Sequence, residues 1–125
     1  MHWTVTKKLE LHGNSSNVSK LVNKYAEITE WELGYAGVAA CEAVKGIGDS
    51  SLTIALFQAL SVGIDFDDDI EIPDEAKPYT LGSDASALDR LAYAYGLLSC
   101  VNMHNEIDIW EENAEGGVRA LVETL

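Results

Sequence analysis

Residues 84–103, DASALDRLAYAYGLLSCVNM, carry apolar side chains at the spacing of an α-helix. The inward positions of this predicted helix are Leu88, Leu91, Ala92, Tyr95, Leu98 and then Val101 or Met103. The pattern predicts a long helix that begins at Asp84 and buries one face in the core.

Further helices are predicted on both sides of this segment. Apolar residues recur at helical spacing over 16–28, in a pattern that extends to Trp31, and again over 52–62, where Ser50 or Ser51 is the expected N-cap. Residues 34–44 are rich in Gly and Ala, which predicts a buried helix that packs closely against a neighbour. The last stretch, 106–125, is expected to form one or two short helices broken at Gly116 and Gly117.

The N-terminus has a different period. Trp3, Val5, Leu9 and Leu11 occupy odd positions between polar residues, with Lys7 as the exception, and a period of two predicts a strand over about 2–12. The expected fold class is therefore α+β and mainly helical. One compact domain over 1–125 would hold this strand, four to six helices and an acidic loop near 65–83.

The charge is large and unevenly distributed. The chain has 125 residues, with 21 Asp and Glu against 8 Lys and Arg, for a formal net charge of −13. Residues 1–62 contribute −1 and residues 63–125 contribute −12. Such a chain is not expected to bind nucleic-acid phosphates directly, because that contact needs a basic surface. The asymmetry instead indicates a protein partner for the acidic half.

The sequence also predicts where in the cell the protein is found. No apolar run approaches the roughly 20 residues of a membrane span, and no secretory signal is recognisable at the N-terminus. A soluble, cytoplasmic protein without membrane contact is expected, with Cys41 and Cys100 as buried free thiols.

The acidic loop does not match a calcium site. Residues 65–75 contain seven acids in eleven positions. If Asp65 takes the first position of an EF-hand loop, Ile70 falls where the turn needs Gly, and Ala76 falls where the bidentate Glu belongs. Cys100 and His104 are too few ligands for a zinc site. Neither a metal nor an organic cofactor is expected.

No enzymatic motif is present. The chain lacks a Gly-x-Ser-x-Gly elbow, and residues 46–51 resemble a phosphate loop without its Gly-Lys-Ser/Thr ending. The three histidines, at positions 2, 12 and 104, form no triad pattern. The chain is therefore expected not to be an enzyme, and a divergent enzyme is the least favoured class.

The helix predicted over 106–115 separates apolar from acidic residues. Ile107, Trp110 and Ala114 follow i, i+3, i+7 on one face. The other face carries four acids at i, i+3, i+4, i+7, namely Asp108, Glu111, Glu112 and Glu115. They span roughly 10 Å, or about 0.4 charge per ångström, against about 0.6 for duplex DNA. A solvated helix face is the alternative interpretation.

These features predict a small acidic inhibitor that binds the basic, nucleic-acid-binding surface of another protein. Two settings fit equally: an immunity protein against a nuclease toxin, and a phage-type nucleic-acid mimic with antirestriction or anti-CRISPR action. The alternative is a structural or adaptor subunit that forms a homodimer through residues 34–44. The expected partner-binding residues are the seven loop acids, the four helix acids and two exposed aromatic anchors: Asp65, Asp67, Asp68, Asp69, Glu71, Asp74, Glu75, Asp108, Glu111, Glu112, Glu115, Phe66 and Trp110.

Overall fold

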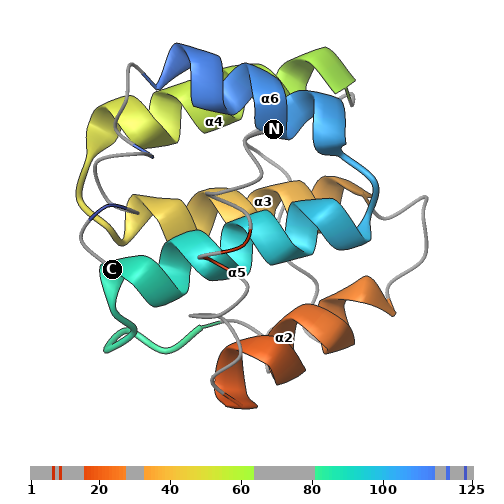
Figure 1. Ribbon diagram of the computed structural model, residues 1–125, viewed down its shortest axis with the longest axis vertical. Helices are drawn as coiled ribbons and strands as arrows, with labels where there is room; N and C mark the ends of the chain where they lie inside the picture. The colour runs from red at the N-terminus through yellow and green to blue at the C-terminus, as the bar shows by residue number, and fades with distance from the viewer. Residues whose placement is uncertain are drawn as a thin grey trace.

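The computed structural model describes residues 7, 9, 16–27, 33–63, 81–114, 118 and 123. Within these residues the protein is mainly helical, and none of them lies in a strand. The helices, labelled as in Figure 1, are α2 (Ser16–Ala26), α3 (Leu33–Lys45), α4 (Ser50–Gly63), α5 (Ala87–Cys100) and α6 (His104–Asn113).

The helices stack in three tiers, with α5 in the middle. Helices α4 and α6 form one outer tier, α3 and α5 the central tier, and α2 the opposite outer tier (Figure 1). Helix α5 packs against α2, α3 and α6, whereas α4 packs against α3 and α6. The segment 91–98 is accordingly buried except at Gly96, as its apolar pattern predicts.

Small residues let the two helices of the central tier, α3 and α5, pack closely. Ala36, Ala39, Ala40 and Ala43 of α3 are all buried, and α3 packs chiefly on α5. The close neighbour predicted for this Gly/Ala-rich helix is thus a helix of the same chain.

The close approach of α2 to α5 depends on Gly96. A Cβ on Gly96 would lie 3.2 Å from Cγ2 of Val22, which is tighter than ordinary van der Waals contact. The missing side chain lets α2 rest directly on α5.

Helix α5 ends earlier than its apolar pattern predicts. Asn102 adopts a left-handed conformation with φ 62°. The N–H of Met103 donates to the Leu98 carbonyl at 2.9 Å and the N–H of Asn102 to the Ser99 carbonyl at 3.1 Å. This is a Schellman ending, in which Asn takes the position usually held by Gly. Met103 therefore does not extend α5 but precedes α6. The start of α5 also differs, because its N-cap is Ser86, whose Oγ accepts from the N–H of Asp89, and not Asp84.

The start of α4 is capped by Asp49 and not by Ser50 or Ser51. One carboxylate oxygen of Asp49 accepts hydrogen bonds from the backbone N–H groups of Ser51 (3.0 Å) and Leu52 (3.4 Å) and from the Ser51 hydroxyl (2.7 Å). The hydroxyl bond is the largest of these effects, and together they lower the pKa of Asp49. The three residues are all good N-caps, so the sequence alone did not distinguish them.

The strand predicted over 2–12 is not supported. Most of that segment lies outside the described residues, but Lys7 and Leu9 have helical backbone conformation. Leu9 is buried and Lys7 exposed. In the described part of the chain, no helix is long and apolar enough to cross a membrane.

Candidate partner-binding surface

Helix α6 has the two-sided character that the sequence predicts. Ile107, Trp110 and Ala114 are buried, so the expected apolar face is confirmed. Of the expected acidic row, Glu112 is exposed, while Asp108 and Glu111 are half-buried. Helix α6 contains no Lys or Arg at the i, i+3 or i, i+4 positions that pair with carboxylates in many exposed helices.

The remaining predicted contact residues lie outside the described part of the chain. They are Glu115 and the whole acidic segment with its aromatic residue: Asp65, Phe66, Asp67, Asp68, Asp69, Glu71, Asp74 and Glu75. The structure therefore brings together Asp108, Glu111 and Glu112.

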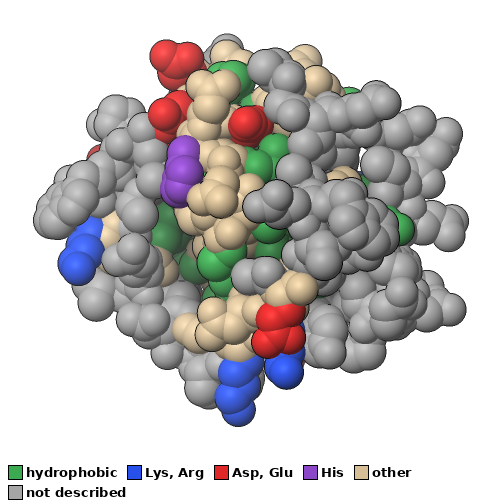
Figure 2. Space-filling model, turned by 90° about the vertical axis from the view of Figure 1, so that its right-hand side faces the viewer, with side chains coloured by type: hydrophobic (Ala, Val, Ile, Leu, Met, Phe, Trp, Pro, Cys, Tyr) green, Lys and Arg blue, Asp and Glu red, His purple; other side chains and the backbone are tan. Residues whose placement is uncertain are grey.

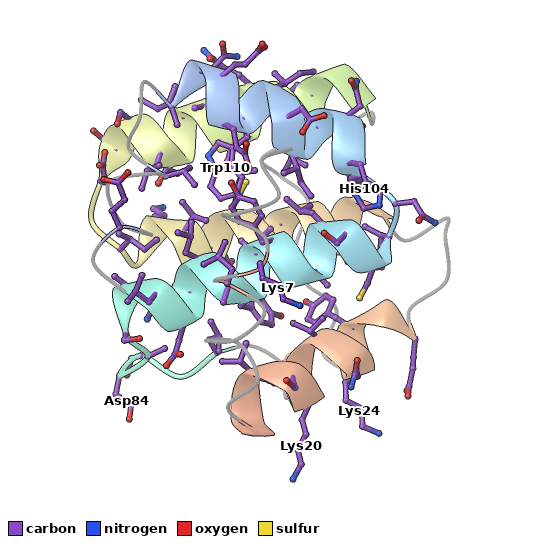
Figure 3. All side chains as sticks on the ribbon, in the orientation of Figure 1. Lys7, Lys20, Lys24, Asp84, His104 and Trp110 are labelled. Carbon is purple, nitrogen blue, oxygen red and sulfur yellow. The ribbon has the colours of Figure 1, made fainter. Side chains whose placement is uncertain are left out.

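Trp110 is not an exposed anchor. Its side chain is fully buried, and its indole Nε1–H donates to the Leu52 carbonyl of α4 at 3.1 Å. Figure 3 shows it pointing from α6 toward the central tier. The prediction that Trp110 contacts a partner was wrong, because a residue at the centre of the inward face of α6 is covered by α4 and α5.

Glu111 is held in place by a tyrosine of α5. The Tyr95 hydroxyl donates to Glu111 Oε1 at 2.7 Å, and the Tyr95 ring packs against Trp110 with centroids 5.0 Å apart. Burial, followed by this hydrogen bond and the charge of Glu111, raises the pKa of Tyr95. Tyr95 is thus protonated at neutral pH and donates to the carboxylate, which fixes the orientation of Glu111.

Glu106 is a charged residue of α6 that the predicted acidic row leaves out. It is only 9% exposed, and its Oε2 has no hydrogen-bond partner among the described residues. The signal was available in the sequence, because Glu106 lies four positions before Trp110 and therefore on the same side of the helix. Glu106 belongs to the buried face and not to the acidic surface.

Positive charge lies at the opposite side of the molecule. Lys20 and Lys24 are exposed on α2 and point away from the helix stack (Figure 3). Figure 2 shows acidic side chains at the upper left of one face, and basic side chains at its left edge and at its lower edge, the latter beside an acidic one. Among the described residues, α6 thus carries carboxylates without lysine or arginine, whereas the α2 side carries Lys20 and Lys24 together with the exposed Glu27 and Asp84.

Two cavities are lined by described residues. One of about 200 Å³ lies between α3 and α5 and is lined by Glu42, Arg90 and Tyr93 with apolar neighbours. The other, of about 600 Å³, lies between α2 and the segment 81–89. Neither is lined by Cys100 or His104.

The cysteines and histidine of the described helices form no common site. Cys41 and Cys100 are free thiols; Cys41 is half-buried and Cys100 is exposed, which corrects the expectation that both are buried. Burial, and then the charge of Glu42, raises the pKa of Cys41 to about 12. Cys100 and His104 stand on opposite sides of the Asn102 turn. No group of three or more potential metal ligands occurs among the described residues.

Two buried tyrosines are expected to respond oppositely to loss of the hydroxyl. The Tyr25 hydroxyl is buried without a hydrogen-bond partner in the described structure, whereas that of Tyr95 binds Glu111. Burial, and then the charge of Glu42, raises the pKa of Tyr25 to about 12. We expect Tyr25→Phe to raise the free energy of unfolding by about 1 kcal/mol, and Tyr95→Phe to lower it by about 1 kcal/mol.

Urea unfolding of the two variants and the wild type measures this difference. Both substitutions keep the ring, including the edge-on contact of Tyr25 with Tyr93 at 6.3 Å. Equal losses in both variants would contradict the assignment of Tyr25 as an unpaired hydroxyl.

Comparison of the chain with protein-family models, with curated proteins and with solved structures found no match.

Proposed function

We propose that this protein is a small acidic inhibitor that acts by binding, not by catalysis, to the basic surface with which another protein holds nucleic acid. Carboxylates take the place of phosphates on the Lys and Arg side chains of the target. An immunity protein against a nuclease toxin and a phage-type antirestriction or anti-CRISPR protein are the two settings of this proposal, both in the cytoplasm.

The observation that carries the proposal is that hydrogen bonds to two other helices hold α6 in place. Trp110 of α6 donates to the Leu52 carbonyl of α4, and Tyr95 of α5 donates to Glu111 of α6. Rotation of α6 about its axis is thereby restricted, which favours a constant position for the outward carboxylates. A surface that is ordered before binding loses less conformational entropy on association.

The charge of the whole chain supports the same function. With −12 of the net −13 in residues 63–125, the field of the protein would steer a basic partner toward the acidic half. The loop acids of 65–75 and Phe66 complete the proposed contact surface.

The homodimer through residues 34–44 is less well supported. The alanines of α3 that would form it are buried within one chain. A dimer of that kind would need α3 to leave α5, so the inhibitor is the function we favour.

The proposal is tested by charge-neutral variants of a single chain. A partner is first captured by the intact protein from the source cell, or from a host that the source infects, and identified by mass spectrometry. Its affinity is then measured by calorimetry for the wild type and for Glu111→Gln/Glu112→Gln. We expect the dissociation constant of the variant to rise about tenfold, which corresponds to about 1.4 kcal/mol.

A control comes from the turn that follows α2. Glu27 is exposed and lies at the other side of the molecule, so Glu27→Gln removes a charge without touching α6. We expect this control to change the affinity less than about twofold. Affinity should also fall as salt rises, and duplex DNA or RNA should compete with the inhibitor for the partner. An affinity that is insensitive to salt, or equally affected by Glu27→Gln, would exclude the proposed surface.

A further inference from the structure

The cavity between α3 and α5 is lined by two residues of opposite charge that do not pair. It holds about 200 Å³, and its charged lining residues are Glu42 of α3 and Arg90 of α5. In the described part of the chain neither side chain forms an ion pair, with the other or with a third residue. Glu42 is exposed, so a molecule from solvent can reach its carboxylate.

Arg90 keeps its positive charge and part of its hydrogen-bonding capacity. Its four hydrogen bonds go to backbone carbonyls, which carry no net charge to offset that of the guanidinium. A guanidinium has five N–H donors, so at least one remains for a ligand. The same four bonds hold the guanidinium in place, and a group that is fixed before binding loses less entropy when a ligand arrives.

A buried hydroxyl beside the cavity also lacks a partner. Tyr25 is fully buried and packs edge-on against Tyr93, a lining residue, with ring centroids 6.3 Å apart. The Tyr25 hydroxyl binds no described residue. Glu42 is nevertheless close to it, because burial and then the charge of Glu42 raise the pKa of Tyr25. A buried polar group without a partner indicates a water or a ligand that completes its hydrogen bonding.

We propose that this cavity binds a small zwitterion, a molecule of the amino-acid class that carries one ammonium group and one carboxylate. The ammonium group binds the Glu42 carboxylate, the ligand carboxylate faces the Arg90 guanidinium, and the Tyr25 hydroxyl supplies a third hydrogen bond. The volume limits the ligand to a few heavy atoms, because at about 30 Å³ per water the cavity has room for roughly six waters. Pockets for drug-sized ligands are larger, at roughly 300–1,000 Å³.

The net charge of the chain favours a zwitterion over a simple ion. At −13 the protein repels an anion, which opposes the binding of a free carboxylate at Arg90. A simple cation is attracted to any of the 21 Asp and Glu residues and not to this cavity in particular. A zwitterion has no net charge, so it gains most where a carboxylate and a guanidinium line the same small cavity.

Titration of the isotope-labelled protein with β-alanine and with γ-aminobutyrate, followed by NMR, tests this proposal. We expect the backbone amide signals to shift around the lining segments 39–43 and 81–93, with a dissociation constant of about 1 mM or below. Propionate and propylammonium each carry only one of the two charges. They should bind at this cavity at least about tenfold more weakly.

Three variants identify the groups that bind the ligand. Glu42→Gln should raise the dissociation constant about tenfold. Glu112→Gln is the matched control, because Glu112 is exposed on α6 and does not line the cavity, and we expect a change of less than about twofold. Tyr25→Phe should weaken binding about threefold although it stabilises the fold. A role in folding alone would not produce these opposite changes.

Three results would overturn the proposal. The first is the absence of shifts around the cavity at about 100 mM of either zwitterion, which would leave water as its only occupant. The second is propionate or propylammonium binding there as tightly as β-alanine. The third is a Glu42→Gln variant with the affinity of Glu112→Gln. The proposed inhibitor function is tested separately, because Glu111 and Glu112 do not line this cavity.

Discussion

Replacing Trp110 by alanine lowers the free energy of unfolding by about 3–5 kcal/mol, a large part of the stability of a domain this size. The side chain is fully buried between α6 and its neighbours and is in ring contact with Tyr95. Its removal leaves a cavity and also deprives the buried Leu52 carbonyl of the indole N–H. Urea unfolding followed by circular dichroism measures the loss.

Two further variants separate the causes of this effect. Trp110→Phe keeps an aromatic ring but not the N–H, and we expect it to cost about 1–3 kcal/mol. Ile109→Ala, at the adjacent half-buried position, should cost less than Trp110→Ala. If Ile109→Ala and Trp110→Ala lowered the free energy of unfolding equally, Trp110 would not be the main residue that holds α6 against its neighbours.

Replacing Arg90 by alanine lowers the free energy of unfolding by about 2–4 kcal/mol. The guanidinium donates to the carbonyl of Ala43 near the end of α3 and to the carbonyls of Gly82, Ser83 and Ala85 before α5, all at 3.3 Å. One side chain thus joins two parts of the chain that lie about 40 positions apart. Lysine has no planar fork of donors, so Arg90→Lys should recover little of the loss.

Substitution of Gly46 tests the Arg90 hydrogen bonds in a second way, because Gly46 lies against the Arg90 guanidinium. A Cβ on Gly46 would overlap the Arg90 guanidinium, so Gly46→Ala should displace it and cost about 1–3 kcal/mol. In the Arg90→Ala background the same change should be neutral or slightly stabilising. Unfolding of the two single variants and the double variant completes the thermodynamic cycle. Additive losses would show that Gly46 acts independently of Arg90.

The sequence predicted helices well where the apolar period was long and poorly where a single residue changed the backbone. The helices expected over 16–28, 34–44 and 52–62 are present with bounds close to those predicted. The end of α5 was missed because Val101 and Met103 continue its apolar pattern, although Asn102, a residue that tolerates the left-handed conformation, was the available signal. Lys7 and Leu9 have helical backbone conformation, although the alternation of apolar and polar residues around them predicts a strand.

The candidate surface was predicted in part. The division of α6 into apolar and acidic sides followed from spacing alone, but Trp110 was placed both on the inward face and among the partner contacts, and one helix face cannot serve both. The hydrogen bond of Tyr95 to Glu111 and the packing of the Arg90 guanidinium against Gly46 both depend on tertiary packing between segments that are far apart in the sequence. No local pattern in the sequence indicates such contacts.

The position of α2 has a consequence for synthesis on the ribosome. This helix, Ser16–Ala26, comes first among the five helices whose bounds the structure describes, yet it packs chiefly on α5, Ala87–Cys100, against Gly96. Among the described helices its principal partner is α5, which leaves the exit tunnel some 60 residues later in translation. Of the other described helices, α3 packs on α4 and α5 packs on α6, the helix that follows each in the sequence, so α2 is the described helix that waits longest for its principal partner.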